Sequence, residues 1–469
     1  MLPFIARTFF HIQERLLGRR SFAILGKLRD SERWPRERLE QLRLARLQAI
    51  VRGAWEHTPY WHEVMARAGI APDDVRSPDD LRRLPLLEKA TIRQRREEMV
   101  WREEGRRVTL VRTSGSTNEA LQFYTSSTRE AHINAARMRG HLSIGVAPGD
   151  KELYYWAAPL ELNVQNRLRR IRDALRNDAF TSGMQLTPEM VPQHLKKWLA
   201  WRPNCIFSYV SSISLLARMA RQGGVDMTPL RDRGLRGIVT TSELLADNRR
   251  LVGEVFDVPV YDSYGLREGG LIGHECNRFT MHSVDEQLIL ETIDPRSGQL
   301  TGGEGELVVT MLASHVMPVI RYRTGDLVSL SRRPCPCGRT LGSVSMSGGR
   351  ILEYLVTSEG RWISALSVIY TCKYMPGLRQ LQARQERLGQ VRLLVATEPG
   401  FPSDGLERIR TAIRARMGGQ DEIVMQIVDE IPPAPSGKQL TIISKVARDL
   451  LARDRFRVPQ REEVHELRE

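Results

Sequence analysis

The sequence predicts an α/β fold: a large doubly wound sheet that includes a small β-subdomain, followed by a smaller α+β unit. The 469 residues are 41% hydrophobic, which supplies enough apolar side chains for real cores. From about residue 108, short apolar runs alternate with helical segments, as they do in βαβ units. Between about residues 286 and 331 only strand-like runs occur, separated by glycine-rich turns, which indicates the β-subdomain.

Residues 1–105 are expected to be mainly helical and to form the first part of the large domain. Ile5, Phe9, Ile12 and Leu16 recur at helical spacing, with arginines off that stripe. We expect this helix to dock on the domain through its apolar stripe. A helix that makes peripheral contact with a membrane surface is the alternative.

Residues 106–347 are expected to contain the sheet. The strand-like runs of the alternating part are VTLVR, KELYYWAAP, CIFSYV, LRGIVTT and VPVYDSYG. Those of the β-subdomain are EQLILETID, GELVVTML and PVIRYRTGDLVSL. Short apolar runs bounded by turn residues are typical of buried strands.

Residues 348–469 are expected to form the second unit. A hairpin around TSEGRWIS is followed by the strand VRLLVATEP, a helix and the strand EIVMQIVDEI. The helix has one apolar stripe of Leu406, Ile409, Ile413 and Met417, and Ser403 or Asp404 precedes it as a cap. Paired glycines in SGGR, at residues 347–350, permit a swivel between the two units.

The net charge of +14 does not predict a nucleic-acid partner. Eight of the 70 basic residues are lysines, and the arginines are interleaved with acids, whereas nucleic-acid binding needs a clustered patch. Five cysteines, an odd number, argue against a disulfide framework. No run of eighteen apolar residues and no signal-peptide pattern occurs, so we expect a cytoplasmic protein.

A hydroxyl-rich segment, TSGSTNEALQFYTSS, follows the strand VTLVR directly. Thr113, Ser114, Ser116 and Thr117 surround Gly115, and such a loop can turn hydroxyls and backbone amides toward a phosphate. It is not a Walker loop, because the GxxxxGK[ST] pattern is absent from the sequence. Taken alone, the segment is more often only a turn.

Three distant segments carry groups that suit a nucleotide. Tyr264, Gly265 and Glu268 follow an apolar strand, where the Tyr ring can cover a purine and the carboxylate can hold Mg²⁺. Asp326 lies in IRYRTGDLVSL, where it can accept both ribose hydroxyls. Lys438 lies in PPAPSGKQL, where it can reach a developing negative charge.

Together and in this order, these segments resemble the adenylate-forming superfamily of acyl-CoA synthetases. The nearest resemblance is to its phenylacetate-CoA ligase-like branch, which includes capsule-cluster proteins, and TTSELL, GELVVT and RYRTGD add to it. The resemblance implies a two-step reaction. A carboxylic acid and ATP give acyl-AMP and pyrophosphate, and CoA then displaces AMP.

The resemblance also implies roles for particular residues. Thr113 to Thr117 would hold the triphosphate, Glu268 would bind Mg²⁺ and Asp326 the ribose. The residues implied at the nucleotide site and hinge are Ser242, Glu243, Tyr264, Gly265 and Arg350. Lys438 would bridge the attacking carboxylate and the α-phosphate in the first step.

Three positions depart from the family pattern. The hinge segment GRILEY keeps only Glu353 of the usual two acids, and Asn118 stands where the family's phosphate loop usually ends in glycine. Arg267 stands where a small hydroxyl residue is usual. A nucleotide-binding protein without turnover is therefore an alternative.

A zinc site is predicted from two short cysteine and histidine pairs. Cys276 and His282 form a C-x5-H pair, and Cys335 and Cys337 form a C-x-C pair on a tight turn. Three thiolates and one imidazole suit a closed tetrahedral zinc site, and the resemblance implies structural zinc there. Cys205 and Cys372 are interpreted as core residues.

The acid and the final acceptor are not identified by sequence. We expect the acid pocket near residues 154–165, residues 208–212, Thr241 and Gly269. An aromatic wall or ordinary core packing would explain Tyr154, Tyr155, Trp156 and Tyr209. Transfer to a sugar, amine or carrier in polysaccharide or cofactor modification is the alternative to CoA, and a homodimer is left open.

Overall fold

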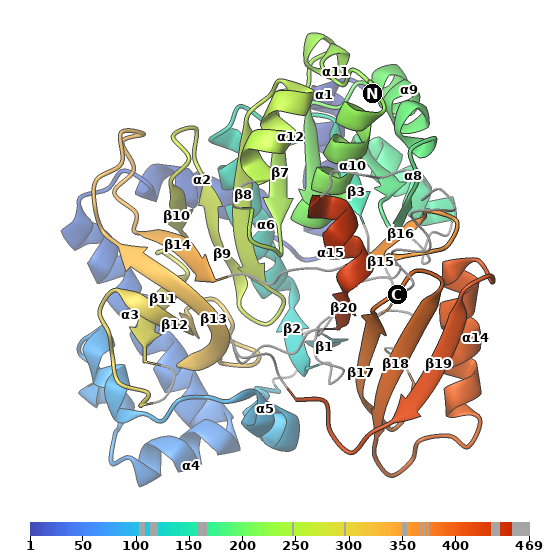
Figure 1. Cartoon of the computed structure of the whole chain (residues 1–469). Helices are drawn as coiled ribbons and strands as arrows, with labels where there is room; N and C mark the ends of the chain where they lie inside the picture. The colour runs from blue at the N-terminus through green and yellow to red at the C-terminus, as the bar shows by residue number, and fades with distance from the viewer. Residues whose placement is uncertain are drawn as a thin grey trace.

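The computed structural model (Figure 1) describes the following residues: 1–102, 108–112, 121–156, 167–245, 248–294, 297–348, 354–364, 368, 372, 375–432 and 441–452. The predicted α/β class is confirmed, since one large mixed sheet carries helices on its faces. Within the described residues, no helix is both long and apolar enough to cross a bilayer.

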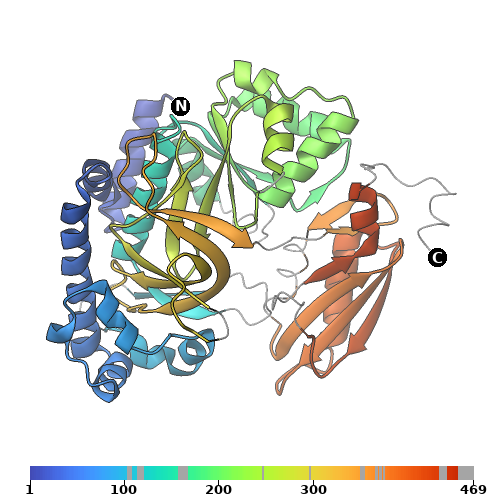
Figure 2. The same cartoon turned by 60° about the vertical axis from the view of Figure 1, so that its left-hand side comes forward.

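The N-terminal segment is helical, as the sequence predicts. Its helices are α1 (Pro3–Leu16), α2 (Ser21–Ser31), α3 (Arg36–His57), α4 (Pro59–Arg67) and α5 (Lys89–Arg95). Short 3₁₀ turns are η1 (Pro72–Asp74), η2 (Pro78–Arg83) and η3 (Arg96–Met99). Pro3 and Pro59 stand in the first turn of their helices, where the missing N–H costs no hydrogen bond. These helices form an outer layer along one side of the large body (Figure 2).

The expected docking face of α1 is wrong. Ile5, Ile12 and Leu16 are exposed, whereas the buried residues of α1 are Ala6, Phe10 and Glu14. The buried face is rotated away from the predicted stripe because Phe10 packs edge-on against Phe22 and the Glu14 carboxylate has partners inside the protein.

The large sheet has eleven strands in the order β11-β12-β13-β14-β10-β9-β8-β7-β6-β3-β4. The strands that run parallel are β3 (Glu152–Trp156), β4 (Asp178–Ser182), β6 (Cys205–Tyr209), β7 (Gly237–Thr241) and β8 (Val260–Leu266). The antiparallel extension comprises β9 (Gly270–Glu275), β10 (Met281–Ser283), β11 (Leu288–Ile293), β12 (Glu304–Met311), β13 (Tyr322–Ser331) and β14 (Ser343–Gly348). The predicted β-subdomain is therefore continuous with the doubly wound part, in one sheet.

The run VTLVR is a strand, but it lies outside the large sheet. It forms β1 (Val108–Arg112), which pairs antiparallel with β2 (Gln122–Ser126) in a two-stranded sheet. Expecting it to alternate with the parallel strands was wrong, since its pairing partner is its neighbour in sequence.

Helices cover the parallel strands. They are α6 (Ser127–Leu142), α8 (Arg167–Leu175), α9 (Met190–Trp201), α10 (Val210–Gln222), α11 (Pro229–Asp232) and α12 (Asn248–Phe256). The parallel strands β6 and β7 are buried almost throughout, as their apolar sequences predict.

The C-terminal part has a sheet of its own, in the order β19-β18-β17-β20. Its elements are β17 (Leu378–Gln385), β18 (Gln390–Thr397), α14 (Gly405–Met417), β19 (Glu422–Ile427), β20 (Ile442–Ser444) and α15 (Lys445–Ala452). The predicted stripe of α14 packs into this core through Ile409, Ile413 and Met417. Asp404 precedes the helix but makes no side-chain capping bond.

A hairpin connects the two cores. Its strands β15 (Tyr354–Val356) and β16 (Trp362–Ser364) form a sheet with β5 (Gln185–Leu186) from the large body. Because strand side chains alternate, Trp362 packs into the core of the parallel part and Ile363 into the C-terminal core.

Candidate active site and metal centre

Two residues predicted at the nucleotide site, 62 positions apart in sequence, are in direct contact. Tyr264, near the end of β8, donates its hydroxyl hydrogen to Asp326 Oδ2 of β13 over 2.8 Å. The Tyr264 side chain is buried. The Asp326 amide donates to Thr324 Oγ1 over 3.1 Å, so a side-chain hydroxyl of β13 fixes the backbone at Asp326.

Glu268 lies in the turn between β8 and β9 and is held by a residue that the sequence reasoning missed. The fully buried Tyr322 donates its hydroxyl hydrogen to Glu268 Oε1 over 2.7 Å. Burial raises the pKa of Tyr322 far above its ordinary value, and the Glu268 charge adds to the rise, so the phenol stays protonated. The sequence signal for Tyr322 was its place in RYRTGD, three residues before Gly325.

A buried arginine supports the same turn. Arg129 of α6 donates through Nη2 to the carbonyl oxygen of Arg267 over 2.8 Å. Burial lowers the pKa of Arg129 to about 10, which still leaves the guanidinium charged at neutral pH. The Arg267 side chain is exposed. Sequence reasoning gave no signal for Arg129, which is one of 62 arginines.

Ser242 and Glu243 follow the end of β7. Ser242 has a φ of 72°, a left-handed conformation that is uncommon for a residue with a side chain. Glu243 accepts hydrogen bonds from the Ser211 amide over 2.6 Å and the Ser211 hydroxyl over 2.9 Å, at the start of α10. Glu243 thus accepts from a backbone N–H in the first turn of α10 that has no partner within the helix.

Two carboxyl groups near this point have pKa values raised to the neutral range. Burial raises the pKa of Glu243 to about 8, against the lowering effect of its two bonds from Ser211. Burial and the neighbouring Glu275 raise the pKa of Asp262 to about 7, although Thr240 donates to it over 3.0 Å. Asp262 begins the DSYG segment, but sequence reasoning did not single it out.

Seven predicted site residues lie outside the described residues. They are Thr113, Ser114, Gly115, Ser116, Thr117, Arg350 and Lys438. Strand β1 ends directly before the hydroxyl-rich segment, and β2 lies in the last part of that segment and continues into α6. Helix α6 carries Arg129, which donates a hydrogen bond to the carbonyl oxygen of Arg267 in the turn that contains Glu268. The helix that follows the hydroxyl-rich segment therefore contacts this turn directly.

Three of the four predicted wall residues form an aromatic cluster at the sheet. The Trp156 ring lies 4.3 Å from Tyr209, and Tyr154 stacks on Phe180 at 4.6 Å. Phe207 stacks on Trp156 at 5.5 Å and was missed by the sequence reasoning. It stands two residues before Tyr209 in CIFSYV, a spacing that places both rings on the same face of β6.

Tyr155 packs in the core, which is the second of the two interpretations that the sequence left open. Its ring lies 5.5 Å from Trp198 on the other face of β3, because successive side chains of a strand point to opposite faces. No hydrogen-bond partner of its buried hydroxyl is present among the described residues.

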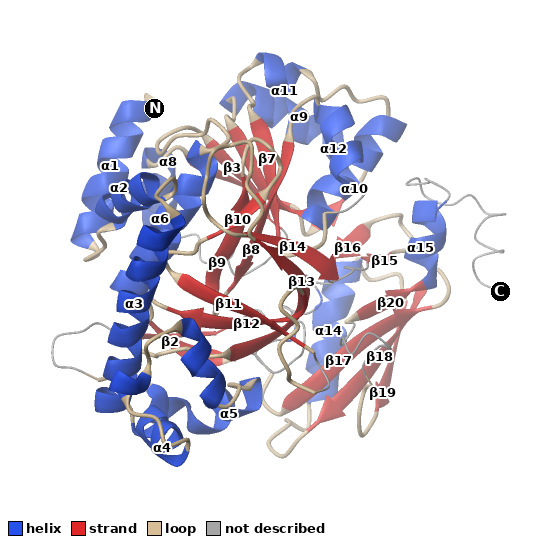
Figure 3. Ribbon diagram, turned by 90° about the vertical axis from the view of Figure 1, so that its left-hand side faces the viewer, coloured by secondary structure: helices blue, strands red, loops and turns tan. Residues whose placement is uncertain are grey.

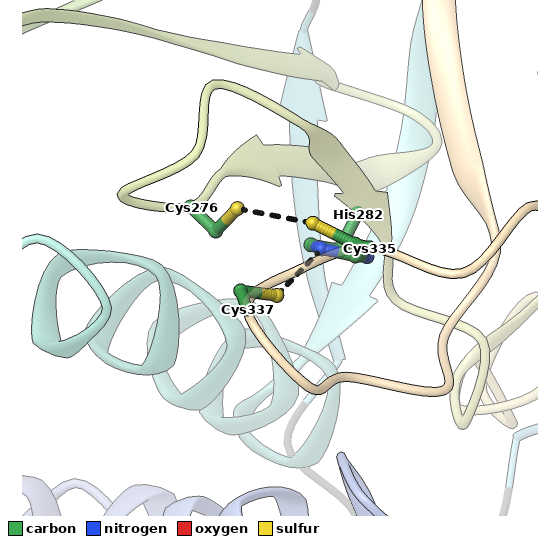
Figure 4. Close-up of side chains that lie close together, drawn as sticks. All are labelled: Cys276, His282, Cys335 and Cys337. Atoms are coloured by element: carbon green, nitrogen blue, oxygen red, sulfur yellow. Dashed lines mark hydrogen bonds between the residues drawn. The ribbon is translucent and has the colours of Figure 1, made fainter.

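The four predicted zinc ligands lie together (Figure 4). The ligand atoms of Cys276, His282, Cys335 and Cys337 are all within 4.8 Å of one another. Cys276 Sγ is 3.9 Å from Cys335 Sγ, and His282 Nε2 is 3.2 Å from Cys337 Sγ. Zinc–sulfur bonds of about 2.3 Å in a tetrahedron separate sulfurs by roughly 3.7 Å, so the donor set and spacing fit zinc.

Strand pairing explains why the two pairs meet. Cys276 and His282 flank the β9–β10 connection, and the cysteine pair lies between β13 and β14. Strand β10 pairs with β14, with His282 opposite Ser343. The two connections therefore emerge beside each other.

Hydrogen-bond donors lie close to two of the three sulfurs. The Arg278 amide donates to Cys276 Sγ over 3.3 Å, and Arg339 Nη1 lies 3.7 Å from Cys337 Sγ. Arg339 also donates to Glu32 Oε2 over 2.9 Å, which connects the cluster to the N-terminal helices. Cys205 and Cys372 are buried core residues, as predicted.

Comparisons with known proteins agree with this architecture. Residues 355–445 match the family model of the CapK C-terminal domain. The chain is 28% identical over 341 residues to a phenylacetate-coenzyme A ligase of Thermus thermophilus, covering 70% of this chain and 74% of that protein. It is 18% identical to protein CapK of Staphylococcus aureus over 402 residues, covering 83% and 86%.

A solved structure has the same fold. The 2-hydroxyisobutyryl-CoA ligase in complex with 2-HIB-AMP and CoA superposes with a TM-score of 0.59 at 21% identity, covering 90% of this chain and 93% of that one. At that identity the likeness establishes the fold alone. The chain thus has the adenylate-forming ligase fold and is a homologue of the phenylacetate-CoA ligases and CapK.

Proposed function

We propose that this protein is an ATP-dependent, AMP-forming acid–CoA ligase. Two hydrogen bonds carry the proposal, one from Tyr264 to Asp326 and one from Tyr322 to Glu268. The charges of Glu268 and Asp326 both raise the pKa of Tyr322, so the two carboxylates lie near the same phenol. The relatives named phenylacetate-coenzyme A ligase support the reaction type.

In the first step, an oxygen of the substrate carboxylate attacks the α-phosphorus of ATP, and the bond to the β-phosphate breaks. Pyrophosphate leaves and acyl-AMP remains. Thr113 to Thr117 hold the triphosphate, and Lys438 bridges the carboxylate and the α-phosphate, where negative charge gathers. Asp326, oriented by Tyr264, accepts the ribose hydroxyls.

Glu268 is the proposed Mg²⁺ ligand. Tyr322 bonds to one of its carboxylate oxygens, and among the described residues the other is left for a hard cation. When bound, Mg²⁺ neutralises charge on the phosphate oxygens. Tyr322 and Arg129 fix the position of the turn that presents Glu268.

In the second step, the CoA thiolate attacks the acyl carbon and AMP leaves. We propose that residues 348–469 act as a mobile lid on the body formed by residues 1–105 and 106–347, with Arg350 at the hinge. The glycines of SGGR support a swivel there. The aromatic cluster around Trp156 and Tyr209 is the proposed wall of the acid pocket.

The test is carboxylate-dependent exchange between ATP and pyrophosphate, measured over a set of acids. Lys438→Ala is expected to lose at least about a hundredfold in exchange, as removal of one preorganised charge contact does. Lys445→Ala, an exposed lysine at the start of α15, is the matched control and should exchange normally. Equal exchange in both variants would contradict the proposal.

Transfer to an acceptor other than CoA is the second candidate, and the CapK match at residues 355–445 favours it. That acceptor would be a sugar, amine or carrier in polysaccharide modification. AMP release that depends on CoA supports the ligase, while exchange without such release supports the alternative. Nucleotide binding with no exchange would identify a protein without turnover.

We also propose structural zinc at the cysteine and histidine cluster. All four donors are protein side chains, and a closed tetrahedral set leaves no coordination position for substrate. The ion would tie the connection after β9, close in sequence to Glu268, to the β13–β14 connection.

A further inference from the structure

The first helix presents an apolar stripe to the outside of the molecule. Ile5, Ile12 and Leu16 are 42%, 53% and 83% exposed, and Phe9 lies at the edge of the stripe. Their spacing of three, four and seven residues places them on one face of α1. Figure 3 shows α1 at the outer edge of the molecule, beside α2.

The opposite face of α1 fixes this orientation. Glu14 is buried and accepts hydrogen bonds from Ser21 and from Asn134, the latter over 3.0 Å. Phe10 lies beneath the guanidinium of Arg176, 4.1 Å from the ring centroid. Rotating the stripe inward would break these contacts and leave a carboxylate without its partners, so the stripe stays exposed.

The charge around the stripe has one sign. Residues 1–29 contain six cations and one acid, and that acid is the buried Glu14. The cations are Arg7, Arg15, Arg19, Arg20, Lys27 and Arg29. All of these except Arg19, which pairs with Glu14, are exposed. The outer surface of this segment therefore combines apolar side chains with positive charge.

We infer that the stripe of α1, Ile5, Phe9, Ile12 and Leu16, docks this protein on the surface of an anionic lipid bilayer. The helix would lie in the plane of the interface with the stripe among the acyl chains and the arginines at the headgroups. Charge favours this occupant over a second copy of the chain, because pairing two copies brings two cationic segments together. This association would be additional to the proposed ligase reaction.

The test is sedimentation of the full-length protein with vesicles. Vesicles of phosphatidylcholine with phosphatidylglycerol are expected to bind it, and vesicles of phosphatidylcholine alone to bind at least about tenfold less. Binding to the anionic vesicles should weaken as salt is raised, because the Debye length shortens.

Two variants distinguish vesicle binding through the α1 stripe from nonspecific adsorption of exposed apolar side chains. The double variant Ile12→Glu and Leu16→Glu is expected to lower vesicle partitioning at least about tenfold, since it places carboxylates on the docking face. The matched control is Ile427→Glu on β19, where Ile427 is 60% exposed and far from α1 in sequence. It should bind vesicles as the unchanged protein does.

Folding and activity are checked on the same samples. Both variants should melt within a few degrees of the unchanged protein, because exposed positions are substituted. Their pyrophosphate exchange without vesicles should also be unchanged, which separates this inference from the proposed function. A third variant, Arg15→Gln with Arg20→Gln, should reduce binding to anionic vesicles if the double variant proves unstable.

Two results would overturn the inference. One is vesicle binding that is the same for the unchanged protein and the stripe variants. The other is a concentration-dependent dimer in lipid-free sedimentation that the stripe substitutions abolish, which would assign the stripe to a second copy of the chain.

Discussion

Tyr264 of β8 donates a hydrogen bond to Asp326 of β13 over 2.8 Å, and so joins the parallel part of the sheet to its antiparallel extension. The proposed ribose ligand is thereby oriented by the residue that is proposed to line the adenine site. Neither strand is the other's neighbour in the sheet order, so the bond depends on the tertiary arrangement.

Replacing Tyr264 by Phe keeps the ring and removes the hydroxyl. Tyr264→Phe is expected to raise the KM for ATP about tenfold, since a hydrogen bond to a charged group contributes about 1.5–3 kcal/mol. The maximal rate should change less, because Lys438 is intact. Steady-state pyrophosphate exchange at varied ATP measures both. An unchanged KM would show that Tyr264 does not position Asp326 for ATP.

Glu243 is expected to make stability fall as pH rises. Its pKa is about 8 in the folded protein, against an ordinary value of 4.5. Below the ordinary value the carboxyl is protonated in both states, so its stabilising contribution is fully present. That contribution is lost as pH rises through about 8, because unfolding allows the group to ionise in water.

Glu243→Gln removes this titration. Urea unfolding between about pH 5 and pH 8.5 should show a steeper loss of stability for the unchanged protein than for the variant. The neighbouring Asp262, which also titrates near pH 7, is present in both proteins and cancels in the comparison to first order. Parallel pH profiles would contradict the shift.

Gly140 of α6 lies against the ring of His274 in β9. A Cβ at this position would stand 2.4 Å from ring atoms of His274, which is itself buried. Gly140→Ala is expected to destabilise the fold by about 1–3 kcal/mol through overpacking. Gly26→Ala, within α2 and with no atom within 4 Å of its added Cβ, is the control. It should stabilise by about 0.5–1 kcal/mol in urea unfolding.

The cysteine cluster is expected to hold about one zinc ion per chain after purification without chelator. Removing zinc with a strong chelator should lower the melting temperature, because metal binding adds to folding free energy. Elemental analysis by mass spectrometry measures the metal.

Cys337→Ser is expected to lower zinc affinity at least about tenfold, since serine is a poor zinc ligand. Cys372→Ala, a buried thiol outside the cluster, should keep the metal. A metal content far below one per chain in the unchanged protein would count against the site.

Local patterns predicted much of this molecule. The βαβ alternation, the strands of the β-subdomain and the stripe of α14 follow from side-chain periodicity, which a single segment expresses on its own. The C-x5-H and C-x-C pairs likewise predicted the cluster, since their donor chemistry is independent of the fold.

Burial and pairing between distant segments were not predictable in the same way. The helix α1 has apolar residues on two faces, and the partners of Glu14 on α2 and α6 decide which face turns inward. Tyr155 and Trp156 are both aromatic, and only the faces of β3 separate their roles.

The sequence by itself therefore determined the elements, their class and the types of chemical group at the site. The tertiary structure decided which groups meet: Tyr264 with Asp326, Glu268 with Tyr322, and Cys276 with Cys335. Periodicity is a property of one segment, whereas a contact depends on the burial free energy of every segment packed around it.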